Sequence, residues 1–147
     1  GLMLTKNGPK ILEYNVRFGD PECQVLLPRI KNDLLEILHL SSKGELNTVT
    51  DYELYPDSTI CVVISSPGYP EKPITGSEII IENNHNILHA GTEKKNNKIY
   101  SKGGRVLNIL GKGSNLSIAR DEAYNLINGI TWKDMYYRRD IGLIENE

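Results

Sequence analysis

The chain has 147 residues, of which 39% are hydrophobic and 24% are charged, and its net charge at neutral pH is −2. This composition is typical of a globular protein with enough apolar side chains to build a core, in one domain or two small ones. The nearly balanced charge argues against nucleic acid or an anionic membrane as a partner, because both require a clustered basic surface. Apolar runs as short as Ile60–Ile64 predict no membrane span. Two distant cysteines, Cys23 and Cys61, are expected to be reduced thiols of a cytoplasmic protein.

The first part of the chain is predicted to be a β-hairpin. Leu2–Thr5 and Lys10–Phe18 have the pattern of strands, and the Asn7-Gly8 pair between them favours a tight turn. Because the strand pattern starts at the first residues, we expect the segment to come from a longer polypeptide. Asp20-Pro21 then predicts the start of a helix, with Asp20 as its cap and proline in the first turn.

Two helical runs follow the hairpin. They cover Glu22–Leu27 and Asn32–Leu40 and are joined at Pro28. The leucines and isoleucine of the second run recur at helical spacing, so this helix is expected to bury one face. Asn32 or Asp33 is its predicted N-cap and Gly44 its predicted end. The polar residues 45–58 are expected to link two parts of the protein.

The remainder of the chain is predicted to consist of short strands and one helix. Thr59–Ser65 is rich in β-branched residues and reads as a buried strand. Gly111-Lys112-Gly113 reads as a turn, after which Ser114 is expected to cap a helix over Leu116–Ile127. The other predicted strands are Ile79–Ile81, Ile87–Thr92, Lys98–Ser101 and Arg105–Leu110, with Glu93–Asn97 as a turn. The sequence therefore predicts an α+β fold that is mainly antiparallel, with one packed helix.

Polar side chains alternate along the second predicted strand. Glu13, Asn15 and Arg17 would share one face at intervals of about 6.6 Å, while the apolar residues between them face a core. A carboxylate and an amide carbonyl are hard oxygen ligands that suit Mg²⁺ beside nucleotide phosphates. Arg17 can instead bind phosphate through its planar fork. The turn at Gly19 and Pro21 is expected to hold Asp20 near the same face.

Two simpler interpretations of this spacing remain open. A strand with one polar face is also typical of the solvated edge of an antiparallel sheet. Glu13 and Arg17 could equally form a surface ion pair, which contributes little to stability.

The polar strand also carries a resemblance to a known family. Glu13-Tyr14-Asn15-Val16-Arg17 is similar to the metal-binding strand of the ATP-grasp superfamily, and its continuation through Glu22 resembles the glycinamide ribonucleotide synthetase family. Further pieces resemble that family in the same order along the whole chain: Gly8-Pro9-Lys10, Leu27-Pro28, Gly68-Tyr69-Pro70, His89-Ala90-Gly91-Thr92, Gly103-Gly104-Arg105-Val106-Leu107 and Tyr137-Arg138-Arg139-Asp140-Ile141-Gly142.

The resemblance implies an ATP-dependent ligase of purine synthesis. In that family ATP phosphorylates glycine to glycyl phosphate, and the amine of 5-phosphoribosylamine attacks it to give glycinamide ribonucleotide, ADP and phosphate. By the resemblance Glu13 and Asn15 would bind Mg²⁺ or Mn²⁺, Arg17 would face the transferred phosphoryl group, and Asp20 would orient substrate. The family's nucleotide-clasping parts have no counterpart in these residues, so we expect this segment alone neither to bind ATP tightly nor to turn over.

The predicted domain organisation follows from the same resemblance. Residues 1–45 would complete the ATP-grasp catalytic domain, and residues 46–147 would form a small β-rich domain that buttresses it. Another ATP-grasp carboxylate–amine ligase of purine synthesis and a non-catalytic docking module are the alternative functions. The parent protein could be a stand-alone enzyme or one part of a multifunctional one.

Overall fold

A computed structural model of the chain describes residues 1–82 and 85–143. The strands are β1 (Leu2–Thr5), β2 (Gly8–Ile11), β3 (Ser58–Ser65), β4 (Glu78–Ile81), β5 (Ile87–His89), β6 (Thr92–Lys95), β7 (Lys98–Ser101), β8 (Arg105–Gly113) and β9 (Ile130–Thr131). The helices are α1 (Glu22–Leu26), α2 (Leu34–Lys43) and α3 (Leu116–Ile127), with short 3-10 turns at Leu27–Arg29 and Leu46–Thr48. Among the described residues, every strand pair is antiparallel.

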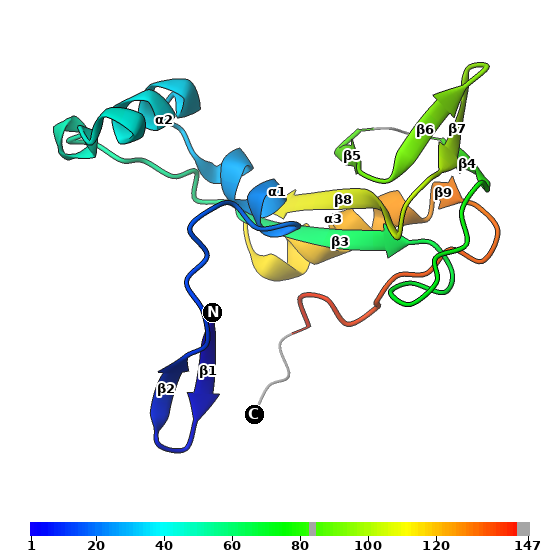
Figure 1. Ribbon diagram of the computed structural model, residues 1–147, viewed down its shortest axis with the longest axis horizontal. Coiled ribbons are helices and arrows are strands. Elements are labelled where there is room, and N and C mark those ends of the chain that lie inside the picture. Colours follow the sequence, from blue (N-terminus) through cyan, green and yellow to red (C-terminus); the bar gives the residue numbers. More distant parts are fainter. Residues whose placement is uncertain (83–84, 144–147) are drawn as a thin grey trace.

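The body of the protein is an antiparallel sheet covered by one helix (Figure 1). Its strand order is β3-β8-β5, and Val62 on β3 lies opposite Ile109 on β8. Alternate side chains of β3 are buried together with one face of α3, which packs across β8 and β3. The core consists of Ile60, Val62, Ile64, Ile79, Ile87, Val106, Leu107, Ile109, Ala119, Ala123, Ile127, Ile130 and Trp132. The predicted α+β fold class and the single packed helix are confirmed.

The junction of β8 and α3 depends on small residues. Gly111 and Gly113 lie inside β8, so the predicted turn at these positions is wrong. A Cβ atom on Gly111 would collide with the backbone carbonyl oxygen of Ala119, because the helix crosses the strand at close range. The predicted cap is also displaced by one residue: the side chain of Asn115, not Ser114, accepts a hydrogen bond of 3.0 Å from the backbone N–H of Ile118.

A second antiparallel sheet has the order β6-β7-β4-β9. The predicted strand over Ile87–Thr92 is wrong, because the chain leaves β5 after His89 and starts β6 at Thr92. A Cβ on Gly91, between the two strands, would lie only 2.7 Å from the Cα of Gly103. Glu93–Lys95, predicted to be a turn, lie in β6. The turn itself is tight, with positive φ at Asn96 (49°) and Asn97 (62°).

The first hairpin is shorter than the sequence predicts. β1 pairs with β2 as expected, but β2 ends at Ile11 and residues 12–18 have no regular structure. The apolar side chains expected to face a core are exposed: Tyr14 is 79% and Val16 is 94% accessible. The strand requires a neighbour to continue. Among the described residues, Gly1 exchanges hydrogen bonds of 2.9 Å with the backbone of Leu12 and Glu13, and no strand continues the pairing after that. Figure 1 shows this hairpin projecting away from the body.

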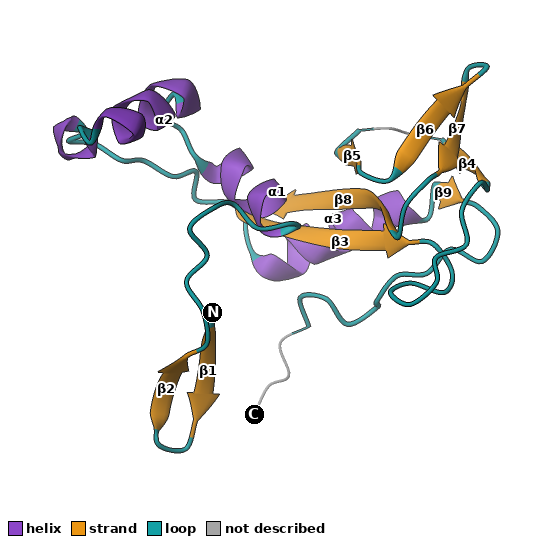
Figure 2. Ribbon diagram, in the orientation of Figure 1, coloured by secondary structure: helices purple, strands orange, loops and turns teal. Residues whose placement is uncertain are grey.

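Helix α2 lies on an arm that also projects from the body (Figure 2). Asp33 caps the helix, accepting hydrogen bonds from the backbone N–H groups of Leu35 (2.8 Å) and Glu36 (3.1 Å), and Gly44 ends it in the left-handed conformation, as predicted. The expected buried face is wrong, because no residue of α2 is buried and Leu35 is 77% exposed. Within residues 1–82 and 85–143, no helix is long and apolar enough to cross a bilayer.

The two ends of this arm, which we call its feet, are residues 29–31 and residues 53–55, and they lie side by side. Lys31 donates its backbone N–H to the carbonyl of Glu53 at 3.1 Å, and Tyr55 donates to the carbonyl of Arg29 at 2.7 Å. An ion pair of 2.9 Å between the side chains of Lys31 and Glu53 adds to this antiparallel contact. The chain after α2 therefore returns alongside the chain that leads into the helix.

Candidate functional site

Glu13 and Asn15, the predicted metal ligands, lie next to each other. The Nδ2 of Asn15 donates a hydrogen bond of 3.2 Å to the Oε1 of Glu13. The N-terminal amine of Gly1 donates to the backbone carbonyl of Glu13 at 2.9 Å, which ties the end of the hairpin to this segment. Both side chains are exposed. Two oxygen-bearing groups thus share one place on the surface although they do not lie in a strand.

The two predicted catalytic residues lie elsewhere. The Nη1 of Arg17 donates to the carbonyl of Phe18 at 3.4 Å, and the guanidinium is otherwise open to solvent. Asp20 is held by residues that follow it in the chain: the Nε2 of Gln24 donates to its Oδ1 at 2.7 Å, and Arg105 contacts it from β8. The structure brings Glu13 and Asn15 into contact, whereas Arg17 and Asp20 each have other partners.

Arg105 makes two contacts with Asp20. Its Nη1 donates to the backbone carbonyl oxygen of Asp20 at 2.7 Å, and its Nη2 lies 3.4 Å from the Oδ2 of the same residue. The planar guanidinium thereby engages the main chain and the side chain of one residue, which a single ammonium group cannot do in the same geometry. This contact spans 85 positions of sequence and joins the polar segment to the body.

A small cavity lies beside this contact. It has a volume of about 240 Å³ and lies between α1, β3 and the C-terminal tail. Val63 and Cys61 form part of its apolar wall, and Arg105 and Arg138 line its rim. The cavity is therefore mainly apolar, with both guanidinium groups already engaged by carboxylates.

Cys61 is chemically quiet in this setting. Burial, and secondarily the negative charge of Asp20, raise the pKa of its thiol to about 12. The thiolate is the nucleophilic form, and a group with this pKa remains protonated at neutral pH. A nucleophilic role for Cys61 is therefore not supported.

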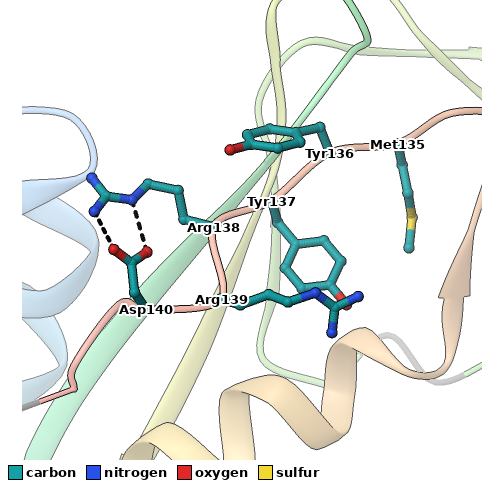
Figure 3. A pocket seen from close by; sticks show the side chains of 6 residues that line it. All are labelled: Met135, Tyr136, Tyr137, Arg138, Arg139 and Asp140. Atoms are coloured by element: carbon teal, nitrogen blue, oxygen red, sulfur yellow. Dashed lines mark hydrogen bonds and ion pairs between the residues drawn. The ribbon is translucent and has the colours of Figure 1, made fainter.

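The tail that lines part of this cavity is fixed to α3, and Figure 3 draws the side chains of its residues 135–140. Arg120 donates from Nε to the carbonyl of Ile141 (3.1 Å) and from Nη2 to that of Arg139 (2.7 Å). Arg138 and Asp140 form an ion pair within the tail, which lowers the pKa of the Asp140 carboxyl, while the guanidinium of Arg139 lies 5.1 Å from the ring centre of Tyr137. Hydrogen bonds from Arg120 thus hold the tail against α3, and Arg138 and Asp140 neutralise each other within it.

Sequence reasoning missed the connection between the polar segment and β8. In the sequence, Arg105 is noted only as part of the Gly103–Leu107 stretch that resembles the family. No residue next to it in the sequence indicates Asp20 as its partner. Among the described residues, no three histidine, cysteine, aspartate or glutamate side chains come together in a group suited to a metal. A site made of one carboxylate, one amide and ligand phosphates requires no such group.

Comparison with known proteins gives matches along the chain. Residues 59–144 match the family model described as phosphoribosylglycinamide synthetase, C domain, and residues 1–23 match the ATP-grasp (A) domain of the same synthetase. Phosphoribosylamine–glycine ligase of Rhodopirellula baltica is 44% identical over 147 residues, and that of Caulobacter vibrioides is 42% identical over 148. The matches cover 96% and 97% of this chain but 34% and 35% of the relatives.

A solved structure supports the same relationship. The crystal structure of phosphoribosylamine–glycine ligase from Thermotoga maritima is similar to this chain with a TM-score of 0.82 and 35% sequence identity. The similarity covers 96% of this chain and 35% of that one. The chain therefore spans about a third of the length of the proteins it matches.

Proposed function

This chain belongs to the phosphoribosylglycinamide synthetase family, and on that premise we propose that it works as the C-terminal third of a phosphoribosylamine–glycine ligase. The reaction would join glycine to 5-phosphoribosylamine through glycyl phosphate, with ATP converted to ADP and phosphate. The enzyme would act in the cytoplasm, with the remaining two thirds of the ATP-grasp polypeptide as its structural partner. The observation that carries the proposal is the contact between Glu13 and Asn15 within the segment matched by the ATP-grasp family model.

The donor set of this pair fits a divalent cation. Glu13 offers a carboxylate and Asn15 an amide, 3.2 Å apart, and a half-turn of the amide presents its carbonyl oxygen in place of Nδ2. Mg²⁺ typically takes one or two oxygen ligands from protein and completes its octahedron with phosphates and water, and Mn²⁺ accepts the same ligands. When bound, the ion would neutralise charge on the phosphate oxygens of ATP. Glu13 and Asn15 would hold it.

Arg17 and Asp20 are proposed for the reacting side of the site. Arg17 is exposed, and its one hydrogen bond within residues 1–82 and 85–143 is long. Its guanidinium is therefore free to turn toward the phosphoryl group as that group moves from ATP to the carboxylate of glycine. Asp20 would orient substrate from the turn that follows. Residues 1–45 would complete the ATP-grasp domain and residues 46–147 would form the C-terminal unit, with helix α2 on the catalytic side of that boundary.

Replacing Arg17 by lysine in the full-length synthetase is expected to lower kcat about tenfold. Lysine keeps the positive charge but loses the planar fork that contacts two phosphate oxygens at once. The KM for ATP should change little, because the interaction strengthens in the transition state. Steady-state release of ADP with glycine and 5-phosphoribosylamine measures both quantities.

Arg139→Lys is the matched control. Arg139 lies on the tail against Tyr137, so its replacement by lysine should leave kcat unchanged. If Arg17→Lys behaves like this control, Arg17 does not contact the transferred phosphoryl group.

A further inference from the structure

We propose that Arg105, on β8 of the C-terminal unit, is a positioning residue that sets the place of the metal-binding segment through its two contacts with Asp20. The inference rests on the proposed function, since it assigns the C-terminal unit a part in building that same site. Arg105 itself would touch neither the metal nor the reacting atoms.

The polar segment has few attachments of its own. Among the described residues, the side-chain hydrogen bonds of Glu13, Asn15 and Arg17 stay within residues 13–18, and the backbone carbonyl of Glu13 accepts a hydrogen bond from the amine of Gly1. Residues 12–18 have no regular structure. Their position relative to the body is therefore set by the joint at Gly19 and Asp20.

Gly19 and Asp20 are in turn held to α1, and α1 is held to β3. Gly19 is buried, its N–H donates to the Oε2 of Glu22 at 3.1 Å, and its carbonyl accepts from the N–H of Cys23 at 2.8 Å. The hydroxyl of Thr59 on β3 donates to the carbonyl of Val25 at 2.7 Å. From Gly19 onward the chain is thus part of the body, and Arg105 holds Asp20, two residues before α1 begins.

The geometry of Arg105 suits positioning more than stabilisation. Its side chain is 40% exposed and that of Asp20 is 49% exposed, and ion pairs in such surroundings contribute little to stability. The same two contacts nevertheless fix both the main chain and the side chain of Asp20. Because displacement of a catalytic group by about 1 Å can cost roughly a hundredfold in rate, a weak contact at a joint can have a large effect on activity.

The test replaces Arg105 by methionine in the full-length synthetase. We expect kcat to fall at least tenfold and the Mg²⁺ concentration for half-maximal rate to rise, while the melting temperature stays within a few degrees of the parent. Arg105→Lys should recover only part of kcat, because one ammonium group cannot reproduce both contacts. Arg138→Met is the matched control: this arginine lines the same cavity but pairs with Asp140 inside the tail, and its loss should leave kcat and Mg²⁺ dependence unchanged.

A double-mutant cycle tests whether Arg105 affects the rate through its contacts with Asp20. Asp20→Ala removes one of the two contacts, so Arg105→Met should cost less in an Asp20→Ala background than in the parent. Full additivity of the two substitutions would overturn the proposal. So would an Arg105→Met variant that raises only the KM for 5-phosphoribosylamine, because that result would mean direct contact with substrate.

Failure of this inference is distinguishable from failure of the proposed function. If Arg105→Met matches Arg138→Met while Glu13→Gln still changes the Mg²⁺ dependence, Arg105 has no positioning role and the metal site stands. If Glu13→Gln leaves the Mg²⁺ dependence unchanged, the metal site itself is wrong, whatever Arg105 does.

Discussion

The full-length synthetase carrying Glu13→Gln is expected to lose activity by a factor on the order of 100 or more. The substitution keeps the size and one acceptor oxygen of the side chain, so the hydrogen bond from Asn15 can survive. It removes the negative charge that would bind the cation. Since a metal bound to phosphate lowers the barrier by several kcal/mol, and about 1.4 kcal/mol corresponds to a factor of ten, a loss of this size follows. The residual rate should require a much higher Mg²⁺ concentration.

The measurement is ADP release at saturating ATP and glycine, titrated with Mg²⁺. Glu71→Gln is a suitable control, because Glu71 is an exposed carboxylate in the loop after β3, remote in sequence from the polar segment. An unchanged rate and an unchanged Mg²⁺ curve in Glu13→Gln would remove Glu13 from the metal site.

Gly111→Ala is expected to produce the largest loss of stability in the C-terminal unit. The new methyl group would be driven into the carbonyl oxygen of Ala119 and would also lie 2.8 Å from the backbone nitrogen of Ala123. Both neighbours are backbone atoms of α3, so they cannot move aside without shifting the helix from the sheet. Overpacking typically costs 1–3 kcal/mol, and we expect about 3 kcal/mol or more here.

Thermal unfolding followed by circular dichroism measures this effect, with an expected fall in melting temperature of more than about 10 °C. Gly129→Ala is the control, because the nearest atom to its added Cβ is the carbonyl oxygen of Leu126 at 3.6 Å, an ordinary contact. Equal melting temperatures for the two variants would show that α3 does not press on β8 as described.

The sequence was most informative where a short stretch carries its own structural signal. β3 follows from a β-branched run, and Asp33 and Gly44 delimit α2 because capping depends on residues adjacent to the helix end. The sequence predicts Ser114 as the cap of α3, but Asn115 caps it, because the position of the cap depends on where β8 ends. β8 extends through Gly113 because this residue still pairs with Ser58 on β3.

The candidate site could be predicted as a set of residues but not as an arrangement. The alternation around Glu13 is a strand pattern, yet a strand needs a partner. No described strand pairs with residues 12–18, where Gly1 bonds only to the backbone of Leu12 and Glu13. The contact of Asp20 with Arg105 was beyond prediction for a different reason: it joins residues 85 positions apart, and no local pattern encodes such a distance. α2 has an amphipathic pattern, but none of its residues is buried, and Leu35 and Leu38 are exposed.

The paired feet of the α2 arm make residues 32–52 a closed excursion from the body. Ile30 and Leu54 bridge each other at its base, so the chain enters and leaves the excursion at one place. Residues can be added to or removed from this arm without changing the path of the rest of the polypeptide. The entropic cost of closing the arm grows only slowly with the number of residues in it. The arm is therefore a part of the protein whose size can vary while β3 and β8 keep their register.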